Sequence, residues 1–278
     1  MDAKTRERYE AWKWNRIKRR VIFPGIGLSF ALIILMLMLV LGSRSERSEM
    51  ADAVEVPEST LMAMEPIVYV SNTHPLEMIE STHDDLSSGE MSIVELSHVL
   101  AGYLESHGIS TLVEDRHVDD QLNQNNWEFD RSYDVARSFV LDARERHSSL
   151  AFFIDLHRDS IPHAYATAEI NGKSYAQVLF VIGTDNPMGY EASHAVASQL
   201  HQMLETKRPG ISRGIFLSGG SGRDGVYNQD LSSMVQLVEI GTVESTKEEV
   251  SHTVEVLAEV LAEYVSQPLD GNDAINQS

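Results

Sequence analysis

One stretch without charged side chains, residues 21–42, constrains the fold of this chain more than any other feature. At about 1.5 Å of helical rise per residue, a stretch of this length just spans a hydrocarbon layer of about 30 Å. A cleaved signal peptide would have a shorter apolar region followed by small residues at the cleavage site, whereas Ser43 and Arg44 follow here. A core helix would have a polar face, which this stretch lacks. We therefore predict one transmembrane helix over residues 21–42.

The charges on either side of this stretch predict its orientation. Residues 1–20 hold eight of the 22 Lys and Arg but only three of the 42 Asp and Glu, which leaves 14 and 39 for the rest and a net charge there of −25. Because cytoplasmic flanks carry the excess of Lys and Arg, we place residues 1–20 in the cytoplasm and the main domain outside the cell membrane. An acidic domain of this kind excludes nucleic acid as a partner, since phosphates require cationic side chains.

Composition and pattern divide the remainder into three parts. Residues 43–65 are small, polar and acidic and predict a linker, residues 66–265 a folded domain, and residues 266–278 a disordered tail. The chain has no cysteine, which excludes disulfides and thiolate sites. Any metal must therefore be bound by His and carboxylate side chains.

Strand and helix patterns alternate along residues 66–265. Short apolar or β-branched runs predict strands at 67–70, 111–113, 150–156, 214–217 and 234–241, with a further adjacent pair, 166–171 and 177–183, around the turn dipeptide Asn171-Gly172. Helical spacing of apolar residues predicts helices at 90–107, 131–146, 190–207 and 247–265. This alternation predicts an α/β fold with a mixed, mostly parallel sheet and helices on both faces.

Ionisable residues follow or interrupt three of the predicted strands. His74 follows the first, His157 comes directly after the 150–156 run, and Glu239 lies within the last. Ligands bind at the carboxyl ends of strands in open α/β sheets. Glu90, at the start of a predicted helix, is close enough to His74 in sequence to reach this edge of the sheet. Two His and one carboxylate make a zinc site with an open position for water. A further glutamate nearby can take the proton of that water. The residue types predict a Zn²⁺ site of His74, Glu90 and His157, with Glu239 as the catalytic base.

Each residue also has a simpler interpretation. A single His at a strand end is more often a structural residue, and Glu90 alone suits a helix N-terminus. Asp155, Arg158 and Asp159 are interpreted as an ionic network that positions the loop. Glu239 differs, because a carboxylate inside an apolar strand is costly unless it is paired or metal-bound.

Four separated segments, in this order, resemble the stage II sporulation protein P family: 153–160, 170–176, 225–230 and 238–245. The resemblance covers residues 66–265. It implies a fold like that of N-acetylmuramoyl-L-alanine amidases and a zinc-dependent peptidoglycan hydrolase, with cleavage of the muramoyl–L-alanine amide and additional endopeptidase action on peptide cross-links. It also implies a place in the septal membrane, with the stage II sporulation proteins D and M as partners during forespore engulfment.

Position by position, the resemblance implies that His74 and His157 bind the metal and that Glu239 is catalytic. Glu77 belongs to the family's Thr-His-x-x-Glu motif, so the third metal ligand is either Glu90 or Glu77. Asn72 stands where the family often has a histidine, which leaves the expected ligand His74 in place. Two other functions stay open: a wall-binding scaffold without catalysis, and another zinc amide hydrolase such as a stem-peptide carboxypeptidase.

Overall fold

The computed structural model describes residues 64–80 and 90–267. The predicted cytoplasmic segment, the predicted membrane span at 21–42, nearly all of the predicted linker and all but two residues of the predicted tail lie outside these ranges. Within the described ranges, no helix has the length and apolar character needed to cross a membrane.

A six-stranded sheet forms the centre of the fold, in the order β4-β1-β5-β10-β8-β9. Its strands are β1 (Val68–Ser71), β4 (Thr111–Val113), β5 (Phe152–Asp159), β8 (Val178–Gly183), β9 (Ser212–Ser218) and β10 (Val235–Thr242). Only the β10–β8 pair is antiparallel; the other four pairs are parallel. The prediction of an α/β fold with a mixed, mostly parallel sheet is confirmed.

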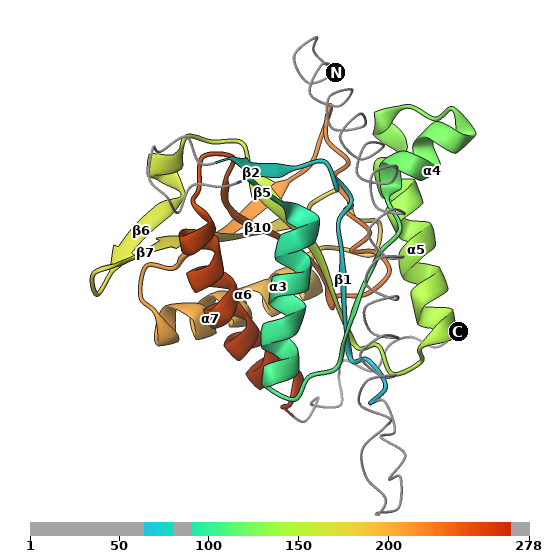
Figure 1. Ribbon diagram of the computed structural model, residues 1–278. Coiled ribbons are helices and arrows are strands. Elements are labelled where there is room, and N and C mark those ends of the chain that lie inside the picture. The colour runs from blue at the N-terminus through green and yellow to red at the C-terminus, as the bar shows by residue number, and fades with distance from the viewer. Residues whose placement is uncertain (1–63, 81–89, 268–278) are drawn as a thin grey trace, which may run out of the picture. The chain divides into compact units, whose positions relative to one another are not determined.

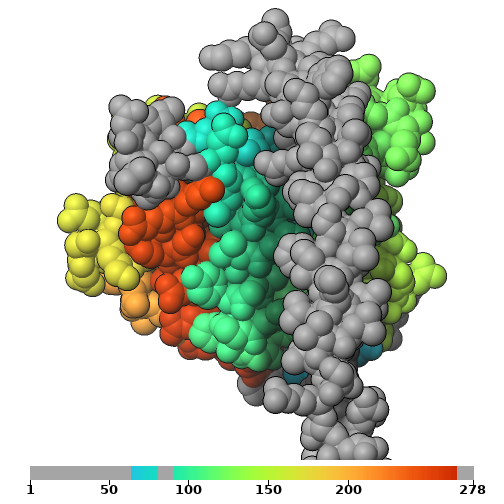
Figure 2. Space-filling model, viewed as in Figure 1, coloured from blue at the N-terminus to red at the C-terminus, as the bar shows by residue number. Residues whose placement is uncertain are grey.

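Side chains alternate between the two faces of this sheet, and both faces are covered by helices. Val68 and Val70 belong to one buried cluster, with α3 (Ile93–Ser106), α6 (Glu191–Lys207) and α7 (Lys247–Val265). Tyr69 and Phe153, in register across β1 and β5, pack on the other face against α5 (Ser132–Arg146), which follows α4 (Val118–Asn125). Figure 1 shows α3 and α7 on one side and α4 and α5 on the other, and in Figure 2 the surfaces of α3 and α7 adjoin. Strands buried on both faces explain the continuous apolar runs in the sequence.

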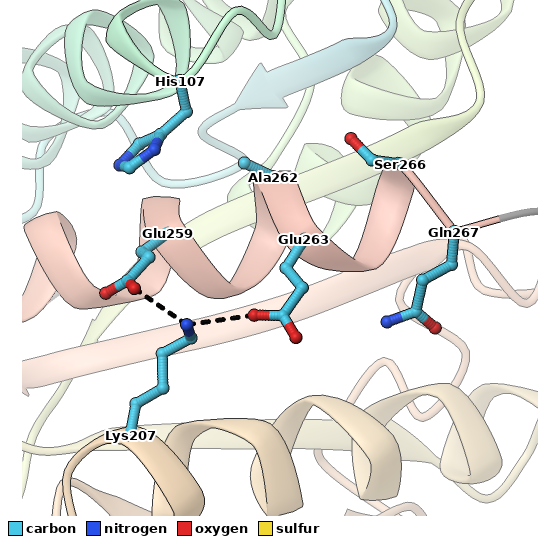
Figure 3. Close-up of a pocket in the computed structure, with 7 residues that line it drawn as sticks. All are labelled: His107, Lys207, Glu259, Ala262, Glu263, Ser266 and Gln267. Atoms are coloured by element: carbon cyan, nitrogen blue, oxygen red, sulfur yellow. Dashed lines mark hydrogen bonds and ion pairs between the residues drawn. The ribbon is translucent and has the colours of Figure 1, made fainter.

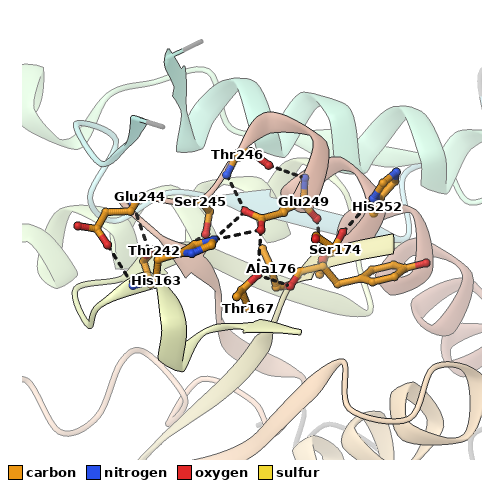
Figure 4. A network of polar contacts seen from close by, with 12 residues as sticks. His163, Thr167, Ser174, Ala176, Thr242, Glu244, Ser245, Thr246, Glu249 and His252 are labelled. Carbon is orange, nitrogen blue, oxygen red and sulfur yellow. Dashed lines mark hydrogen bonds and ion pairs between the residues drawn. The ribbon is translucent and has the colours of Figure 1, made fainter. Parts of the chain in front are cut away.

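Capping residues fix where two of these helices begin. Ser92 and Glu95 form a capping box at α3, and Thr246 and Glu249 form another at α7. Glu249 also lies 3.0 Å from His163 Nε2 and accepts a hydrogen bond from Thr167 Oγ1 at 2.9 Å (Figure 4). His163 begins the 3₁₀ turn η2 (His163–Tyr165). The carboxylate of Glu249 therefore caps α7 and also links this helix to residues 163–167.

Two predicted elements differ from the structure. The predicted helix 90–107 begins only at Ile93, because β3 (Glu90–Ser92) first pairs with β2 (Met78–Glu80). The predicted pairing of 166–171 with 177–183 is wrong: β6 (Thr167–Ile170) pairs with β7 (Lys173–Ala176). Asn171 and Gly172, with φ of 52° and 76°, make a two-residue turn, so the residues directly after it form the partner strand.

A surface hollow of about 530 Å³ lies where α6 and α7 end. Lys207 lies there between Glu259 and Glu263, at 2.8 and 3.0 Å (Figure 3). Its lining includes none of the predicted site residues. These ion pairs join the carboxyl end of α6 to α7.

Candidate functional site

The candidate site lies on the sheet face that α5 covers, at the amino-terminal end of that helix, where the ring centre of Tyr133 is 5.7 Å from that of His74. His157 of β5 is in register with Glu239 of β10, and Asp155 is in register with Leu237 one step earlier. Residues two apart in a strand point to the same face, so the three polar side chains share it with Phe153, which packs near α5. The strands therefore hold His157 and Glu239 side by side on one face.

The turn after β1 is fastened to β5 by side-chain hydrogen bonds. Asn72 Nδ2 donates to Leu156 O at 2.9 Å. The backbone N–H of Thr73 donates to Asp155 Oδ1 at 2.8 Å, and Thr73 Oγ1 donates to Asp155 Oδ2 at 2.6 Å. These bonds set the position of His74, whose ring centre lies 5.2 Å from that of His157 with the rings nearly perpendicular. The two predicted histidines are therefore brought together.

His157 lies between two carboxylates. Its Nε2 is 3.1 Å from Asp155 Oδ2, and its Nδ1 is 3.5 Å from Glu77 Oε2. Burial favours the neutral ring, but the two carboxylates outweigh it and hold the pKa of His157 well above its ordinary value. Burial likewise opposes ionisation of Asp155 and Glu77, yet contact with His157 holds both of their pKa values below the ordinary ones.

Two ring nitrogens at the site are buried without a hydrogen bond. His74 Nδ1 has no hydrogen-bond partner, and although His157 Nε2 lies close to Asp155, the geometry is not that of a hydrogen bond. Burial, followed by the charge of His157, lowers the pKa of His74 to about 4, so its ring is neutral at pH 7. A neutral imidazole with an unpaired nitrogen is a metal-ligand donor.

Glu239 belongs to a chain of ionic contacts that ends at Arg213. Burial, with the charge of Asp159 as the next cause, raises the pKa of Glu239 to about 7 from an ordinary 4.5. Arg213 donates from NH2 to Asp159 Oδ2 at 2.8 Å and, against the effect of burial, keeps the pKa of Asp159 low. A carboxyl group with a pKa near neutrality suits proton transfer in either direction.

The two candidate carboxylate ligands lie in different surroundings. Glu77 Oε2 contacts His157 and accepts a hydrogen bond from the backbone N–H of Arg158 at 3.0 Å. Glu90 is exposed on β3, in register with Glu80. The structure therefore brings Glu77 to the two histidines and leaves Glu90 on the hairpin.

Among the residues that the structure describes, no three His, Cys, Asp or Glu side chains are arranged to hold a metal ion. The donor types nevertheless fit zinc. Two ligands about 2.0–2.1 Å from a tetrahedral zinc ion lie roughly 3.3 Å apart, close to the 3.5 Å between Glu77 Oε2 and His157 Nδ1. Asp155, against the other ring nitrogen of His157, has the place of the carboxylate that usually orients a metal-bound histidine.

Sequence reasoning missed two features of the site. Arg213 has no motif around it, and its contact with Asp159 spans 54 residues. Phe129 stacks on His74, with ring centres 4.7 Å apart and an interplanar angle of 20°. The sequence signal for Phe129 was its place in an apolar pair with Trp127, outside any periodic run.

Comparison with known proteins identifies the family. The model of the stage II sporulation protein P family matches residues 41–262. The chain belongs to the stage II sporulation protein P family. A member of that family, "Stage II sporulation protein P" of Bacillus subtilis (strain 168), is 33% identical over 224 residues, which are 78% of this chain and 56% of the relative. The chain thus spans little more than half the length of that relative. The family match confirms the resemblance inferred from the four motifs.

Solved structures give only remote likenesses. N-acetylmuramoyl-L-alanine amidase AmiC2 of Nostoc punctiforme is 15% identical, with 72% of this chain and 98% of that one covered and a TM-score of 0.41. Ami1, an N-acetylmuramyl-L-alanine amidase of Mycobacterium smegmatis, is 13% identical, with coverage of 72% and 96% and a TM-score of 0.37. TM-scores of this size support no conclusion about the function of this member of the stage II sporulation protein P family.

Proposed function

We propose that this member of the stage II sporulation protein P family is a zinc-dependent peptidoglycan hydrolase that cleaves the amide between muramic acid and L-alanine. The observation that supports it best is the grouping of His74, whose neutral ring has an unpaired Nδ1, with the ring of His157 and with Glu239, whose pKa is about 7. The family's place in sporulation agrees with a wall substrate.

We propose His74, His157 and Glu77 as the zinc ligands, since Glu77 rather than Glu90 contacts His157. Bound there, zinc would polarise the amide carbonyl and lower the pKa of a water molecule to about 7. Asp155 would keep the ring of His157 oriented through its second nitrogen.

Glu239 moves the proton in this scheme. Its carboxylate accepts a proton from the attacking water as the oxygen adds to the carbonyl carbon, and it returns that proton to the amide nitrogen as the carbon–nitrogen bond breaks. The products are a lactyl carboxylate on the sugar and a free stem peptide. Asp159, held ionised by Arg213, accepts a hydrogen bond from the protonated form of Glu239 and so sets the direction of its carboxyl group.

Digestion of purified sacculi by the full-length protein, with and without zinc, tests the proposal. We expect a chelator to abolish release of stem peptides and zinc to restore it. Glu239→Gln should keep bound zinc and lose at least 10²-fold in rate, the lower range of general-base effects. A metal-free protein that digests sacculi at full rate would refute the zinc site, and Glu239→Gln at full rate would refute the base.

The fragments released distinguish the other functions. An amidase leaves intact stem peptides and sugar strands without them, a carboxypeptidase releases terminal amino acids, and an endopeptidase opens cross-links. A wall-binding scaffold would bind sacculi without cutting them, and His157→Ala would leave that binding unchanged.

We further propose that residues 21–42 anchor the protein in the cell membrane, with residues 1–20 in the cytoplasm and residues 66–265 outside. The charge asymmetry supports this orientation. Protease added to intact spheroplasts should remove the domain and leave residues 1–20 protected. Pull-down with the anchored protein would then test binding of the stage II sporulation proteins D and M.

A further inference from the structure

An aromatic side chain forms part of the wall of the candidate site. Phe129 lies in the 3₁₀ turn η1 (Phe129–Arg131) and stacks on His74, and yet 64% of its surface is exposed. A single exposed apolar side chain is common on a soluble domain, but a ring that stacks on a proposed zinc ligand and stays open to solvent is positioned to contact a substrate bound there. Phe129 therefore offers solvent an aromatic surface directly beside a proposed zinc ligand.

The backbone around Phe129 is held in place before any ligand binds. Asn126 adopts the left-handed conformation with φ of 52°, and the N–H of Trp127 donates to Leu122 O at 2.9 Å. Ser132 Oγ donates to Phe129 O at 2.6 Å. A surface ordered in advance loses less conformational entropy on binding than a loop that must fold around its ligand.

A second exposed aromatic side chain lies two residues earlier in the chain. Trp127 is 44% exposed, and the guanidinium of Arg131 lies 5.1 Å from its ring centre. Arg131 is in turn paired with Asp134. We call Trp127 and Phe129 the aromatic platform.

Charge indicates which half of the proposed substrate the platform binds. Glu128 and Asp130, on either side of Phe129, are both exposed. Their carboxylates repel a stem peptide that carries carboxylates of its own, but they do not repel an uncharged N-acetylated sugar ring. The C–H groups on one face of a sugar ring also match the negative face of an aromatic ring.

We propose that the aromatic platform binds a sugar ring of the glycan strand beside the scissile amide, so that Phe129 determines specificity for glycan-bearing substrates. This inference rests on the proposed peptidoglycan hydrolase function. It assigns Phe129 to substrate binding and leaves proton transfer with Glu239.

Binding of peptide-free glycan strands to the full-length protein tests the platform without any need for catalysis. We expect Phe129→Ala to weaken binding by about 3- to 10-fold, from the range of aromatic stacking effects. Phe129→Trp, which keeps an aromatic face, should bind within about twofold of the unmodified protein. Leu141→Ala, which removes an exposed apolar side chain from α5, is the matched control and should change nothing.

Turnover of two substrates with the same scissile amide, one with the sugar and one with a sugar-free acyl group, separates binding from support of His74. We expect Phe129→Ala to raise KM for the glycan substrate by the same 3- to 10-fold, with kcat unchanged, and to leave the sugar-free substrate unaffected.

Three results would contradict this inference or the function beneath it. Glycan binding that is equal in Phe129→Ala and unmodified protein overturns the platform. An equal fall in kcat on both substrates assigns Phe129 to holding His74 and also overturns it. Glycan binding that depends on Phe129 in a protein that cuts neither substrate supports the platform and refutes the proposed hydrolase.

Discussion

The raised pKa of Glu239 makes protein stability depend on pH in a direction that can be calculated. The folded-state pKa of about 7 exceeds the ordinary value of 4.5. Between these two pH values the folded state keeps a proton that the unfolded state has lost, so the free energy of unfolding falls as pH rises through this window. Below pH 4.5 both states are protonated and the effect disappears.

Glu239→Gln removes this dependence while keeping the shape of the side chain. A difference of about 2.5 pH units corresponds to about 3.4 kcal/mol, from about 1.36 kcal/mol per pKa unit. Because Glu239 is only partly buried, solvent screening reduces this, and we expect about 2 kcal/mol. The amide of Gln also donates a hydrogen bond, as the protonated carboxyl group of Glu239 does to Asp159.

Urea denaturation of the full-length protein at pH 4 to 9 measures this effect, with a chelator present because a bound cation would favour the ionised carboxylate. The variant should match the unmodified protein near pH 4 and exceed it by about 2 kcal/mol above pH 7. Glu90→Gln, at an exposed position, serves as the control and should stay within about 0.5 kcal/mol throughout. A difference between Glu239→Gln and unmodified protein that does not vary with pH would refute the assigned pKa.

Three further substitutions test the framework of the site. Asp155→Ala removes a buried partner of a histidine and of two hydrogen-bond donors, and should cost about 3–5 kcal/mol in urea denaturation. A Cβ added at Gly241, where φ is 59°, would overlap Ser245 Oγ, so we expect Gly241→Ala to lower stability by about 2–4 kcal/mol in thermal melting. Gly172→Ala, where space is open, should cost about 1 kcal/mol. Arg213→Ala removes the cation beside Asp159, so the pKa of the neighbouring Glu239 should rise. The acidic limb of the pH–rate profile for sacculus digestion should then move up by about one pH unit. An unmoved limb would refute this role of Arg213.

The sequence predicted the strands of the sheet well because their burial on both faces leaves continuous apolar runs. It also indicated Glu239, since an acid within such a run is unusual, and the structure places it beside Asp159 and His157. It missed α4, in which only Val118 and Leu122 are buried and the helical pattern is weak.

The positions of several site residues depend on contacts between distant parts of the chain, which the sequence pattern does not reveal. Glu77 and Glu90 both follow His74 within a short span, but spacing does not reveal that β2 and β3 pair and place Glu90 on an exposed hairpin. Arg213 reaches Asp159 only because β8 runs antiparallel to β10 and β9 runs parallel to β8, which brings the start of β9 to the edge where β5 ends. Local patterns carry no information about such a reversal.

The position of β10 between β5 and β8 has a consequence for how this protein family can diversify. Glu239 lies in a strand with a neighbour on each side, so a substitution that moves it must also disturb two other strands. Phe129 lies in a short connection between two helices, where a change of side chain disturbs no strand of the sheet. Descendants of one ancestral chain can therefore vary residues 126–131 while His157 and Glu239 keep their places in the sheet.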